Sequence, residues 1–338
     1  MKVLVTGCAG FIGFHIAKKL VNGKHEVYGI DCMNDYYDVD LKKARLYELG
    51  IKKENATKPG KGSQSDKSSN FWFTNIDLTN EKGLKDFFSS HQFDVVCNLA
   101  AQAGVRYSIV NPGVYVDNNI KGFFNLLDCV AHNNAKLFVY ASSSSVYGNS
   151  REMPFRIQSE TSKPVSFYAA TKKANELMAY TYSELYKLKT IGMRLFTVYG
   201  PWGRPDMAYF DFTNKILKGE PISLYNHGQL QRDFTYIDDI VNGFVKIIES
   251  GGKFTEEKYK IYNLGNHDPV TLERFVKAIE TAIAKKAVIN YLPMQQGDVE
   301  STYADISEST KDFQFVPSTS IEVGIKKFVE WYRDYYKI

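Results

Sequence analysis

The fold is decided near the amino terminus by the stretch Lys2-Val3-Leu4-Val5-Thr6-Gly7-Cys8-Ala9-Gly10-Phe11-Ile12-Gly13. A short apolar strand leads into three glycines spaced Gly-x-x-Gly-x-x-Gly, and a helical pattern follows through Leu20. Gly7, Gly10 and Gly13 would allow a tight turn, close approach of the backbone to a pyrophosphate, and a helix amino terminus aimed at that anion. The stretch predicts a dinucleotide-binding turn; a glycine-rich turn that binds no ligand is the alternative.

A second apolar strand, His25 to Ile30, follows the first helical segment and ends in Asp31. A carboxylate at this strand end can accept hydrogen bonds from both hydroxyls of an adenosine ribose, and it would repel a 2′-phosphate. Asp31 therefore favours NAD over NADP as the cofactor.

The alternation of strand and helix continues as far as Leu195. Further apolar strands are predicted at Phe71 to Ile76, Asp94 to Asn98, Leu137 to Ala141 and Thr190 to Leu195. Repeated strand and helix units imply a parallel sheet with right-handed crossovers. We therefore predict an α/β fold with a doubly wound parallel Rossmann sheet and a smaller C-terminal substrate-binding lobe. The expected NAD-binding domain is 1–196 with a return segment at about 233–264, and the lobe comprises 197–232 and 265–338.

A run of small hydroxyls, Ser142-Ser143-Ser144-Ser145-Val146-Tyr147-Gly148, follows the strand that ends at Ala141. It points donors beyond the carboxyl edge of the sheet, where open α/β sheets bind ligands. Tyr168 and Lys172 stand four residues apart in a helix predicted over Phe167 to Lys187, so their side chains share one face. A nearby ammonium favours the phenolate, which would let Tyr168 act as a base near neutral pH. Taken alone, Tyr-x-x-x-Lys also occurs by chance on solvated helices.

The composition excludes several classes of protein. The 338 residues are 44% hydrophobic and 24% charged, as in ordinary globular proteins. No apolar run approaches the about 18–20 residues of a membrane span, and the first residues leave no room for a secretory signal. We expect a cytoplasmic protein without a membrane partner. The net charge of +4 is scattered, which argues against a nucleic-acid partner. Spacings of the four cysteines and six histidines predict neither disulfides nor a metal site.

One segment, residues 52–70, is nearly free of apolar side chains and rich in Lys, Ser and Gly. This composition predicts a flexible surface insertion, with a basic recognition segment as the alternative.

Small or polar residues after other predicted strands are further ligand candidates. Asp77 could meet the adenine amino group, and Leu99-Ala100-Ala101 would let a cofactor lie against the backbone. Arg106 could reach an anionic substrate or be only a surface charge. Asn118 lies in a helix predicted from Asn111 to about His132, where it could satisfy a backbone group or help a proton reach the tyrosine.

The amino-acid composition of the sequence changes after Phe196. Residues Thr197 to Ala208 (Thr-Val-Tyr-Gly-Pro-Trp-Gly-Arg-Pro-Asp-Met-Ala) are dense in Gly, Pro and aromatic side chains, which predicts a long ordered loop. Beyond it, Tyr225 is suited to stacking on a base or to simple core packing, and Arg232 is suited to bidentate contact with a phosphate.

Several of these motifs together resemble the extended short-chain dehydrogenase/reductase superfamily over essentially the whole chain. They are Thr6-Gly7-x-x-Gly10-Phe11-Ile12-Gly13, Asp31, Asp77-Leu78, Ser142 to Gly148 and Tyr168-x-x-x-Lys172. Within that superfamily the sequence resembles nucleotide-sugar 4-epimerases. More narrowly, Asn34-Asp35-Tyr36-Tyr37, Ala103 to Ser108 and Thr197 to Ala208 are similar to UDP-glucuronate 4-epimerases.

The resemblance implies an enzyme that converts UDP-glucuronate to UDP-galacturonate through a 4-keto sugar, with tightly held NAD. Ser143 would hydrogen-bond the sugar 4-hydroxyl, Tyr168 would take its proton, and Lys172 would keep the tyrosine ionised and bind the nicotinamide ribose. A homodimer built on the helices near 112–132 and 168–187, and a role in polysaccharide precursor synthesis, are also implied.

The cofactor-binding set expected from the motifs and the resemblance is Gly7, Gly10, Phe11, Ile12, Gly13, Asp31, Asp77, Leu78, Leu99, Ala100, Ala101, Asn118, Ser142, Tyr168 and Lys172. The substrate-binding set is Arg106, Ser144, Ser145, Thr197, Arg204, Tyr225, Arg232 and Asp298.

The acidic sugar makes a specific demand on the site. A 4-keto derivative of glucuronate is a β-keto acid, which loses carbon dioxide readily unless its carboxylate is held and the hydride is returned quickly. A bidentate arginine with a neighbouring hydroxyl suits that task. Arg204 and Thr197 are the candidates, with Arg106 as a further contact.

Two positions compare this chain with its relatives. Sugar dehydratases of the superfamily carry an Asp-Glu pair before Val-Tyr-Gly, and the decarboxylases carry a Glu, whereas this chain has Ser144 and Ser145. Neither elimination nor decarboxylation then has its usual acid. Gln295-Gln296-Gly297-Asp298 departs from the Arg-Pro-Gly-Asp of many UDP-galactose epimerases, so uridine would be held by Arg232 and Asp298 without that arginine.

Three other functions stay open from the sequence. The first is a 4-epimerase of UDP-glucose or UDP-N-acetylglucosamine, which would leave Arg204 without an anionic partner if the site is dry. The second is a UDP-glucuronate decarboxylase, disfavoured by Ser145. The third is a catalytically silent nucleotide-binding protein, which the intact Ser143, Tyr168 and Lys172 set argues against.

Overall fold

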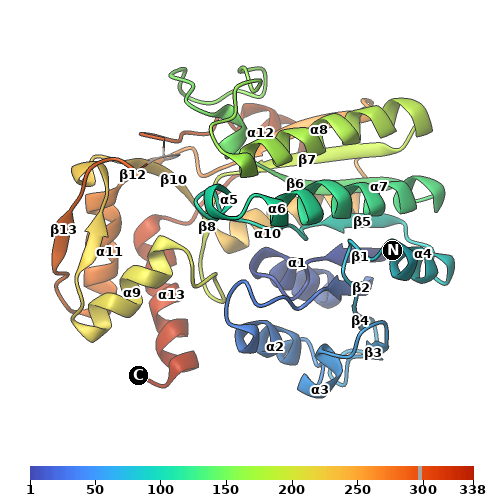
Figure 1. Cartoon of the computed structure of the whole chain (residues 1–338), viewed down its shortest axis with the longest axis horizontal. Coiled ribbons are helices and arrows are strands. Elements are labelled where there is room, and N and C mark those ends of the chain that lie inside the picture. The colour runs from blue at the N-terminus through green and yellow to red at the C-terminus, as the bar shows by residue number, and fades with distance from the viewer. Residues whose placement is uncertain (296–298) are drawn as a thin grey trace. The chain divides into compact units, whose positions relative to one another are not determined.

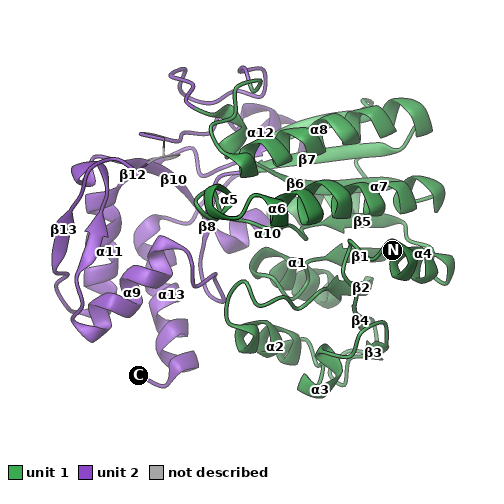
Figure 2. Cartoon of the chain, in the orientation of Figure 1, with its two compact units in different colours: residues 1–148, 161–194, 241–262 green, residues 149–160, 195–240, 263–338 purple. Residues whose placement is uncertain are grey.

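The computed structural model of the chain describes residues 1–295 and 299–338, and Asp298 lies outside the described residues. The chain forms two compact units, shown in Figure 2. The first contains residues 1–148, 161–194 and 241–262, and the second contains 149–160, 195–240 and 263–338. Residues 149–160 thus belong to the second unit, whereas we placed them in the first domain. The assignment of NAD binding to the first part and substrate binding to the second stays a prediction.

An eight-stranded sheet forms the centre of the first unit (Figure 1), in the order β11-β7-β6-β5-β1-β2-β4-β3. Its strands are β1 (Lys2–Thr6), β2 (Glu26–Asp31), β3 (Gly62–Gln64), β4 (Phe71–Asn75), β5 (Val95–Asn98), β6 (Leu137–Ser143), β7 (Lys189–Leu195) and β11 (Tyr259–Leu264). The pairs β1–β2, β1–β5, β2–β4 and β5–β6 are parallel, and β3–β4 is antiparallel. This mostly parallel sheet confirms the predicted fold class.

Helices connect the strands of this sheet, except for β3 and β4. They are α1 (Phe11–Asn22), α2 (Val39–Glu48), α3 (Lys53–Ala56), α4 (Glu81–Ser89), α5 (Tyr107–Val110), α6 (Gly113–Tyr115), α7 (Phe123–His132), α8 (Phe167–Tyr186) and α10 (Ile237–Ser250). Helices α7 and α8 contact each other and lie side by side along the sheet in Figure 1. The buried face of α7 carries large apolar residues such as Phe123 and Leu126, whereas that of α8 carries small and polar residues such as Ala179 and Asn175.

The helix predicted from Asn111 to His132 is not continuous. Residues Val116–Gly122 form a π-helix (η1) between α6 and α7. The Asn118 side-chain amide donates to the carbonyl oxygen of Val114 at 2.8 Å, which is the acceptor that the Asn118 backbone N–H would use in an α-helix. Competition for this carbonyl gives a physical reason for the wider turn, because π-helical bonds pass over one further residue.

The prediction of a flexible insertion at 52–70 was wrong for part of that segment. It contains α3, and β3 pairs antiparallel with β4 at the edge of the sheet. Backbone and side-chain hydrogen bonds order it in place of apolar contacts: Ser65 Oγ accepts from the backbone N–H groups of Lys67 and Ser68, both at 3.0 Å, and Gln64 donates to the Ser69 carbonyl at 2.7 Å.

The second unit contains two smaller sheets, with strand orders β12-β10-β8 and β13-β9. Its strands are β8 (Thr197–Tyr199), β9 (Ile222–Leu224), β10 (Gln231–Tyr236), β12 (Pro269–Thr271) and β13 (Ile289–Tyr291). Its helices are α9 (Ala208–Lys218), α11 (Leu272–Ile283), α12 (Ser307–Phe313) and α13 (Ile321–Tyr336). Phe234 and Phe275 stack at 4.5 Å in its core. Thr197–Tyr199 begins the predicted loop as a strand, because it pairs in parallel with Phe234–Tyr236.

Candidate active site

The glycine turn between β1 and α1 is too tight for side chains. Gly7 has φ +68°, and a Cβ there would lie 2.8 Å from the backbone nitrogen of Ala100. A Cβ on Gly13 would overlap the Gly7 carbonyl oxygen and lie 2.8 Å from its carbonyl carbon. The Gly10 N–H donates to that same oxygen at 2.9 Å. Side chains at these positions would collide with the chain's own backbone, so the turn requires glycine, as the predicted pyrophosphate-binding turn does.

This turn lies where the order of the strands reverses. β1 has β2 on one side and β5 on the other, so the connections after β1 and β5 leave in different directions. Thr6 at the end of β1 ties the two ends together, because its Oγ1 donates to Asn98 Oδ1 at 2.5 Å and accepts from the backbone N–H groups of Leu99 and Ala100 at 3.2 and 3.1 Å. Open α/β sheets bind ligands at such a switch point.

Asp31, at the end of β2, is buried and fixed by the backbone around it. Its Oδ2 accepts from the Ala9 N–H at 3.2 Å and its Oδ1 from the Met33 N–H at 2.9 Å. Each oxygen therefore keeps lone-pair capacity for a further donor, such as a ribose hydroxyl. Asp77 instead caps a turn, with Oδ1 accepting from the N–H and hydroxyl of Thr79 at 2.8 and 2.7 Å.

Two buried cations beneath this region were missed from the sequence. The Lys42 ammonium donates to the carbonyl and side-chain oxygens of Asn34 at 2.8 and 2.7 Å and lies 3.9 Å from Asp31 Oδ1. Arg45 is fully buried and donates to the Ala9 carbonyl at 2.9 Å and to the Tyr37 hydroxyl at 2.7 Å. Lys42 and Arg45 stand three residues apart on a predicted helix, so both lie on one face of it. This spacing could have identified them as a basic pair.

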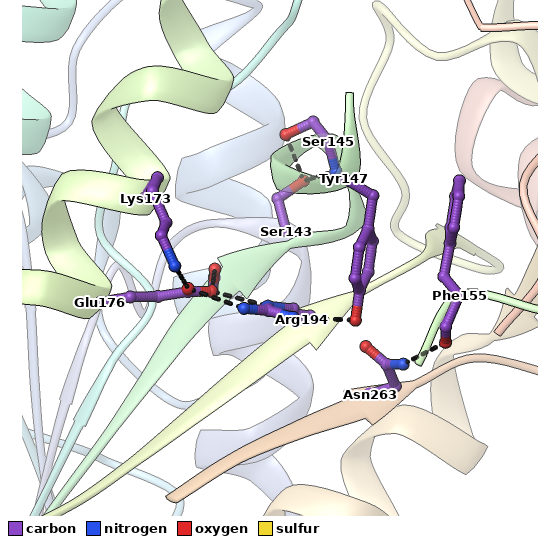
Figure 3. Close-up of polar contacts among 9 residues, drawn as sticks. Ser143, Ser145, Tyr147, Phe155, Lys173, Glu176, Arg194 and Asn263 are labelled. Atoms are coloured by element: carbon purple, nitrogen blue, oxygen red, sulfur yellow. Dashed lines mark hydrogen bonds and ion pairs between the residues drawn. The ribbon is translucent and has the colours of Figure 1, made fainter. Parts of the chain in front are cut away.

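The serine run forms the end of β6 and a 3-10 turn, Ser144–Tyr147. Ser143 Oγ accepts from the N–H of Ser145 at 3.2 Å and from its hydroxyl at 2.9 Å (Figure 3). A serine oxygen can accept two hydrogen bonds, and the two from Ser145 use both of these sites. The Ser143 hydroxyl hydrogen is left to be donated to another group. Ser142 points elsewhere: its Oγ donates to Glu176 Oε1 at 2.7 Å.

Tyr168 and Lys172 lie one turn apart on α8, as the spacing predicted. The Lys172 ammonium donates to the Ala141 carbonyl oxygen on β6 at 2.8 Å and lies 5.9 Å from the centroid of the Tyr168 ring. Burial lowers the pKa of Lys172 to about 8, because the charged form loses its water. The structure therefore brings a nearly dry ammonium, a phenol and the serine strand together within one unit.

Other candidates in the first unit have identifiable partners. Asn118 donates to Val114, as described above, whereas the neighbouring Asn119 is buried and joins two segments. Its Oδ1 accepts from the Gln102 N–H at 2.8 Å, and its Nδ2 lies 3.1 Å from the Thr171 hydroxyl. Arg106 is exposed and immediately precedes α5.

The remaining substrate candidates belong to the second unit. Arg204 holds a carboxylate in a two-pronged contact: its Nε and Nη2 donate to Asp206 Oδ1 and Oδ2 at 3.0 and 2.5 Å. Arg232 Nη1 donates to the carbonyl oxygens of Gln231 and Glu300 at 2.8 and 3.2 Å. Thr197 pairs with Phe234 in the sheet, and Tyr225 immediately precedes a short 3-10 turn.

Residues 1–295 and 299–338 contain neither a membrane-spanning helix nor a cluster of metal-binding side chains. None of the helices in that part of the chain is long and apolar enough to cross a membrane. Nor does that part contain a group of three or more His, Cys, Asp or Glu side chains that could hold a metal ion.

Known proteins match the chain over nearly its whole length. The model of a family described as the NAD dependent epimerase/dehydratase family matches residues 3–265. Protein CapI of Staphylococcus aureus is 48% identical over 350 residues, covering 100% of both chains. UDP-glucuronate 4-epimerase 2 of Arabidopsis thaliana is 44% identical over 350 residues, covering 100% of this chain and 77% of the plant protein.

Among solved structures, UDP-glucuronic acid 4-epimerase from Bacillus cereus, in complex with UDP-glucuronic acid and NAD, superposes with a TM-score of 0.87. It is 30% identical, and the match covers 99% of this chain and 100% of the other. These matches agree with the glycine turn, Asp31 and the Tyr168–Lys172 pair described above. The chain belongs to the NAD dependent epimerase/dehydratase family.

Proposed function

We propose that this chain is an NAD-dependent UDP-glucuronate 4-epimerase, which converts UDP-glucuronate to UDP-galacturonate. The observation that carries the proposal is the arrangement around Lys172. Its buried ammonium binds the Ala141 carbonyl two residues before Ser143 and lies next to the ring of Tyr168. A proton donor, a base and a cation that stabilises the base are the groups needed to oxidise and reduce a secondary alcohol.

The chain's own residues then handle the proton at O4 of the sugar. The positive charge of Lys172 favours the Tyr168 phenolate, which takes the O4 proton and later returns it. Ser143, whose oxygen already accepts two hydrogen bonds from Ser145, donates its hydroxyl hydrogen to O4 and so fixes the direction of approach.

The residues of the first unit fit NAD. The turn of Gly7, Gly10 and Gly13 has no room for side chains, so its backbone can meet the pyrophosphate, and Asp31 presents a fixed carboxylate for the adenosine ribose. When bound, NAD would supply the redox chemistry of the reaction, as acceptor and then donor of a hydride at C4 of the sugar.

Arg204 supports an acidic sugar as the substrate. Its Nε and Nη2 bind Asp206 in this structure, so a glucuronate carboxylate, which offers the same two oxygens, would bind this edge of the guanidinium by displacing Asp206. Held in this way, the carboxylate is kept from the orientation that leads to decarboxylation. Ser144 and Ser145 place no acid before Val146, which disfavours the dehydratase and decarboxylase reactions. The relatives named as UDP-glucuronate 4-epimerases point to the same sugar.

Incubation of the purified protein with UDP-glucuronate or UDP-glucose, with no added cofactor, tests the proposal. The sugar proton signals are followed by NMR. Conversion of UDP-glucuronate alone to its C4 epimer is expected. Conversion of UDP-glucose instead would replace the proposed substrate by a neutral sugar, and bound NAD without turnover of any UDP-sugar would support a catalytically silent protein.

An Arg204→Ala variant is expected to lose preference for the acidic sugar and to release some carbon dioxide from it.

We further propose a cytoplasmic homodimer that supplies polysaccharide precursors. Leu177 and Leu185 on α8 are 57% and 67% exposed, and Phe124 on the adjacent α7 is 45% exposed. Two helices with apolar outer faces are suited to form a bundle with the same pair in a second copy. Free cysteines at positions 8, 32, 97 and 129 are compatible with a reducing compartment.

A further inference from the structure

A buried ion pair lies beside the serine turn in the first unit. Arg194, near the end of β7, donates from Nε to Glu176 Oε1 at 2.8 Å and from Nη2 to Oε2 at 2.9 Å (Figure 3). Glu176 and Arg194 are 1% and 3% exposed, respectively. Lys173 adds a donor to Oε2 at 3.2 Å, and Ser142 adds one to Oε1 at 2.7 Å. Each carboxylate oxygen therefore accepts two hydrogen bonds, which is a full complement.

A contribution to folding stability does not by itself explain why this ion pair is buried. Burial raises the pKa of Glu176, but the hydrogen bonds and charge of Arg194 outweigh it and hold the pKa below its usual range, so the carboxylate is ionised. Removing two charges from water is costly, and buried ion pairs can often be replaced by apolar residues without loss of stability. Their clearest use is to fix one arrangement of the elements that carry them.

The pair reaches the chain on both sides of Ser143. On one side Glu176 accepts from Ser142, the preceding residue. On the other, Arg194 Nη1 donates to the Tyr147 hydroxyl at 3.0 Å, and its guanidinium carbon lies 4.8 Å from the centroid of that ring. Tyr147 ends the 3-10 turn that begins directly after Ser143. The serine turn is thus held at its beginning and at its end.

The same pair is fixed to the helix that carries the base. Tyr168, Lys172 and Glu176 follow one another at intervals of four residues on α8, so they lie on one face of it. Lys172 binds the Ala141 carbonyl, and Glu176 binds Ser142. Helix and strand are therefore joined at two consecutive residues, one turn apart on the helix.

We propose that Glu176, held by Arg194, is a positioning residue that sets the placement of the Ser143 hydroxyl relative to Tyr168 and Lys172. This inference rests on the proposed function. Glu176 touches neither reacting atom; it acts through Ser142 and, by way of Arg194, through Tyr147. A misplacement of about 1 Å in a reacting group can reduce a rate about 100-fold, so loosening this joint lowers kcat while leaving substrate affinity largely intact.

Three variants test the proposal. Ser142→Ala breaks only the link to the strand and leaves the ion pair whole. Glu176→Gln keeps the shape and removes the charge. Glu176→Gln/Arg194→Met removes both charges. It is included because Glu176→Gln alone leaves Arg194 as an unpaired buried cation, which destabilises the fold. Glu81→Gln is the matched control, since it removes a carboxylate that pairs with Lys85 on the exposed face of α4.

Initial rates are measured on whichever UDP-sugar the wild type converts, together with bound NAD and the thermal midpoint. We expect kcat to fall about 10- to 100-fold in Glu176→Gln and in the double variant, with KM and bound NAD near wild type, a smaller fall for Ser142→Ala, and no change for Glu81→Gln. A folded double variant with wild-type kcat would overturn the proposal, as would a loss of kcat that only follows the loss of folded protein.

Wild-type turnover reports separately on the proposed function. If the wild type converts a neutral sugar, the proposed substrate falls and the comparison of variants still decides the role of Glu176. If it converts no UDP-sugar, the positioning role falls with the reaction it serves.

Discussion

Substitution of Gly13 by alanine tests the reading of the glycine turn most directly. The added Cβ would lie 2.8 Å from the Gly7 carbonyl carbon and 3.0 Å from Cys8 Cα, and it would overlap the Gly7 oxygen. All three are backbone atoms, so no side chain can rotate away. The start of α1 must move off the turn, and the hydrogen bond from Gly10 to Gly7 is strained.

Overpacking of this kind costs about 1–3 kcal/mol. At about 2 °C per kcal/mol for a chain of this size, the thermal midpoint should fall by about 2–6 °C. Bound NAD, released by denaturation and measured by its absorbance, should fall with it, because the displaced backbone is the part that we propose to meet the pyrophosphate. Gly113→Ala is the matched control. Its Cβ would have nothing within 4 Å, and alanine in a helix is favoured by about 0.5–1 kcal/mol over glycine. A Gly13→Ala protein with wild-type NAD content and midpoint would refute the argument.

Tyr168→Phe should abolish turnover while NAD stays bound, because only the proton-transfer group is removed; a near-normal rate by the NMR assay would exclude Tyr168 as the base. Because the pKa of Lys172 is about 8, its ammonium loses the proton as the pH rises through that value, and kcat should fall on the alkaline side. Lys172→Arg keeps the charge and should move this fall to higher pH, and an unchanged pH profile would contradict the role of the cation. If the chain forms the proposed homodimer, Leu177→Glu/Leu185→Glu should convert it to a monomer in sedimentation experiments, since four carboxylates would enter one apolar interface; an unaltered sedimentation coefficient would contradict an interface at α8.

Features that depend on neighbours in the sequence were the most predictable. The spacing of Gly7, Gly10 and Gly13 and the position of Asp31 after its strand are set within a few residues, because turn geometry and strand ends are local. The Tyr168–Lys172 face followed from helical periodicity alone. The parallel sheet followed from the general rules for alternating strands and helices.

Features that depend on distant partners were missed. Arg194 stands in the apolar strand Thr-Ile-Gly-Met-Arg-Leu, and a buried arginine requires a counter-charge. That rule could have flagged Arg194, but choosing Glu176 among the 38 acidic residues required knowing that β7, β6 and α8 meet. Asn118 and Asn119 show the same limit, because adjacent identical residues on a helix point in directions that only the tertiary structure distinguishes.

Composition was also an incomplete guide to order at residues 52–70. It correctly indicated that few apolar contacts hold this segment, yet the hydrogen bonds of β3 to β4 hold it all the same. Backbone pairing depends little on side-chain chemistry, so a polar segment can be ordered wherever a sheet offers an unpaired strand.

The same edge strand bears on how the protein behaves when it is concentrated. β4 carries fully buried phenylalanines at positions 71 and 73, and without β3 its backbone donors and acceptors would invite pairing with a strand of another molecule. A three-residue polar strand flanked by lysines at 61 and 67 occupies that edge and is itself a poor template for further addition. The segment therefore covers an edge of the sheet that would otherwise be open to pairing with a strand of another molecule.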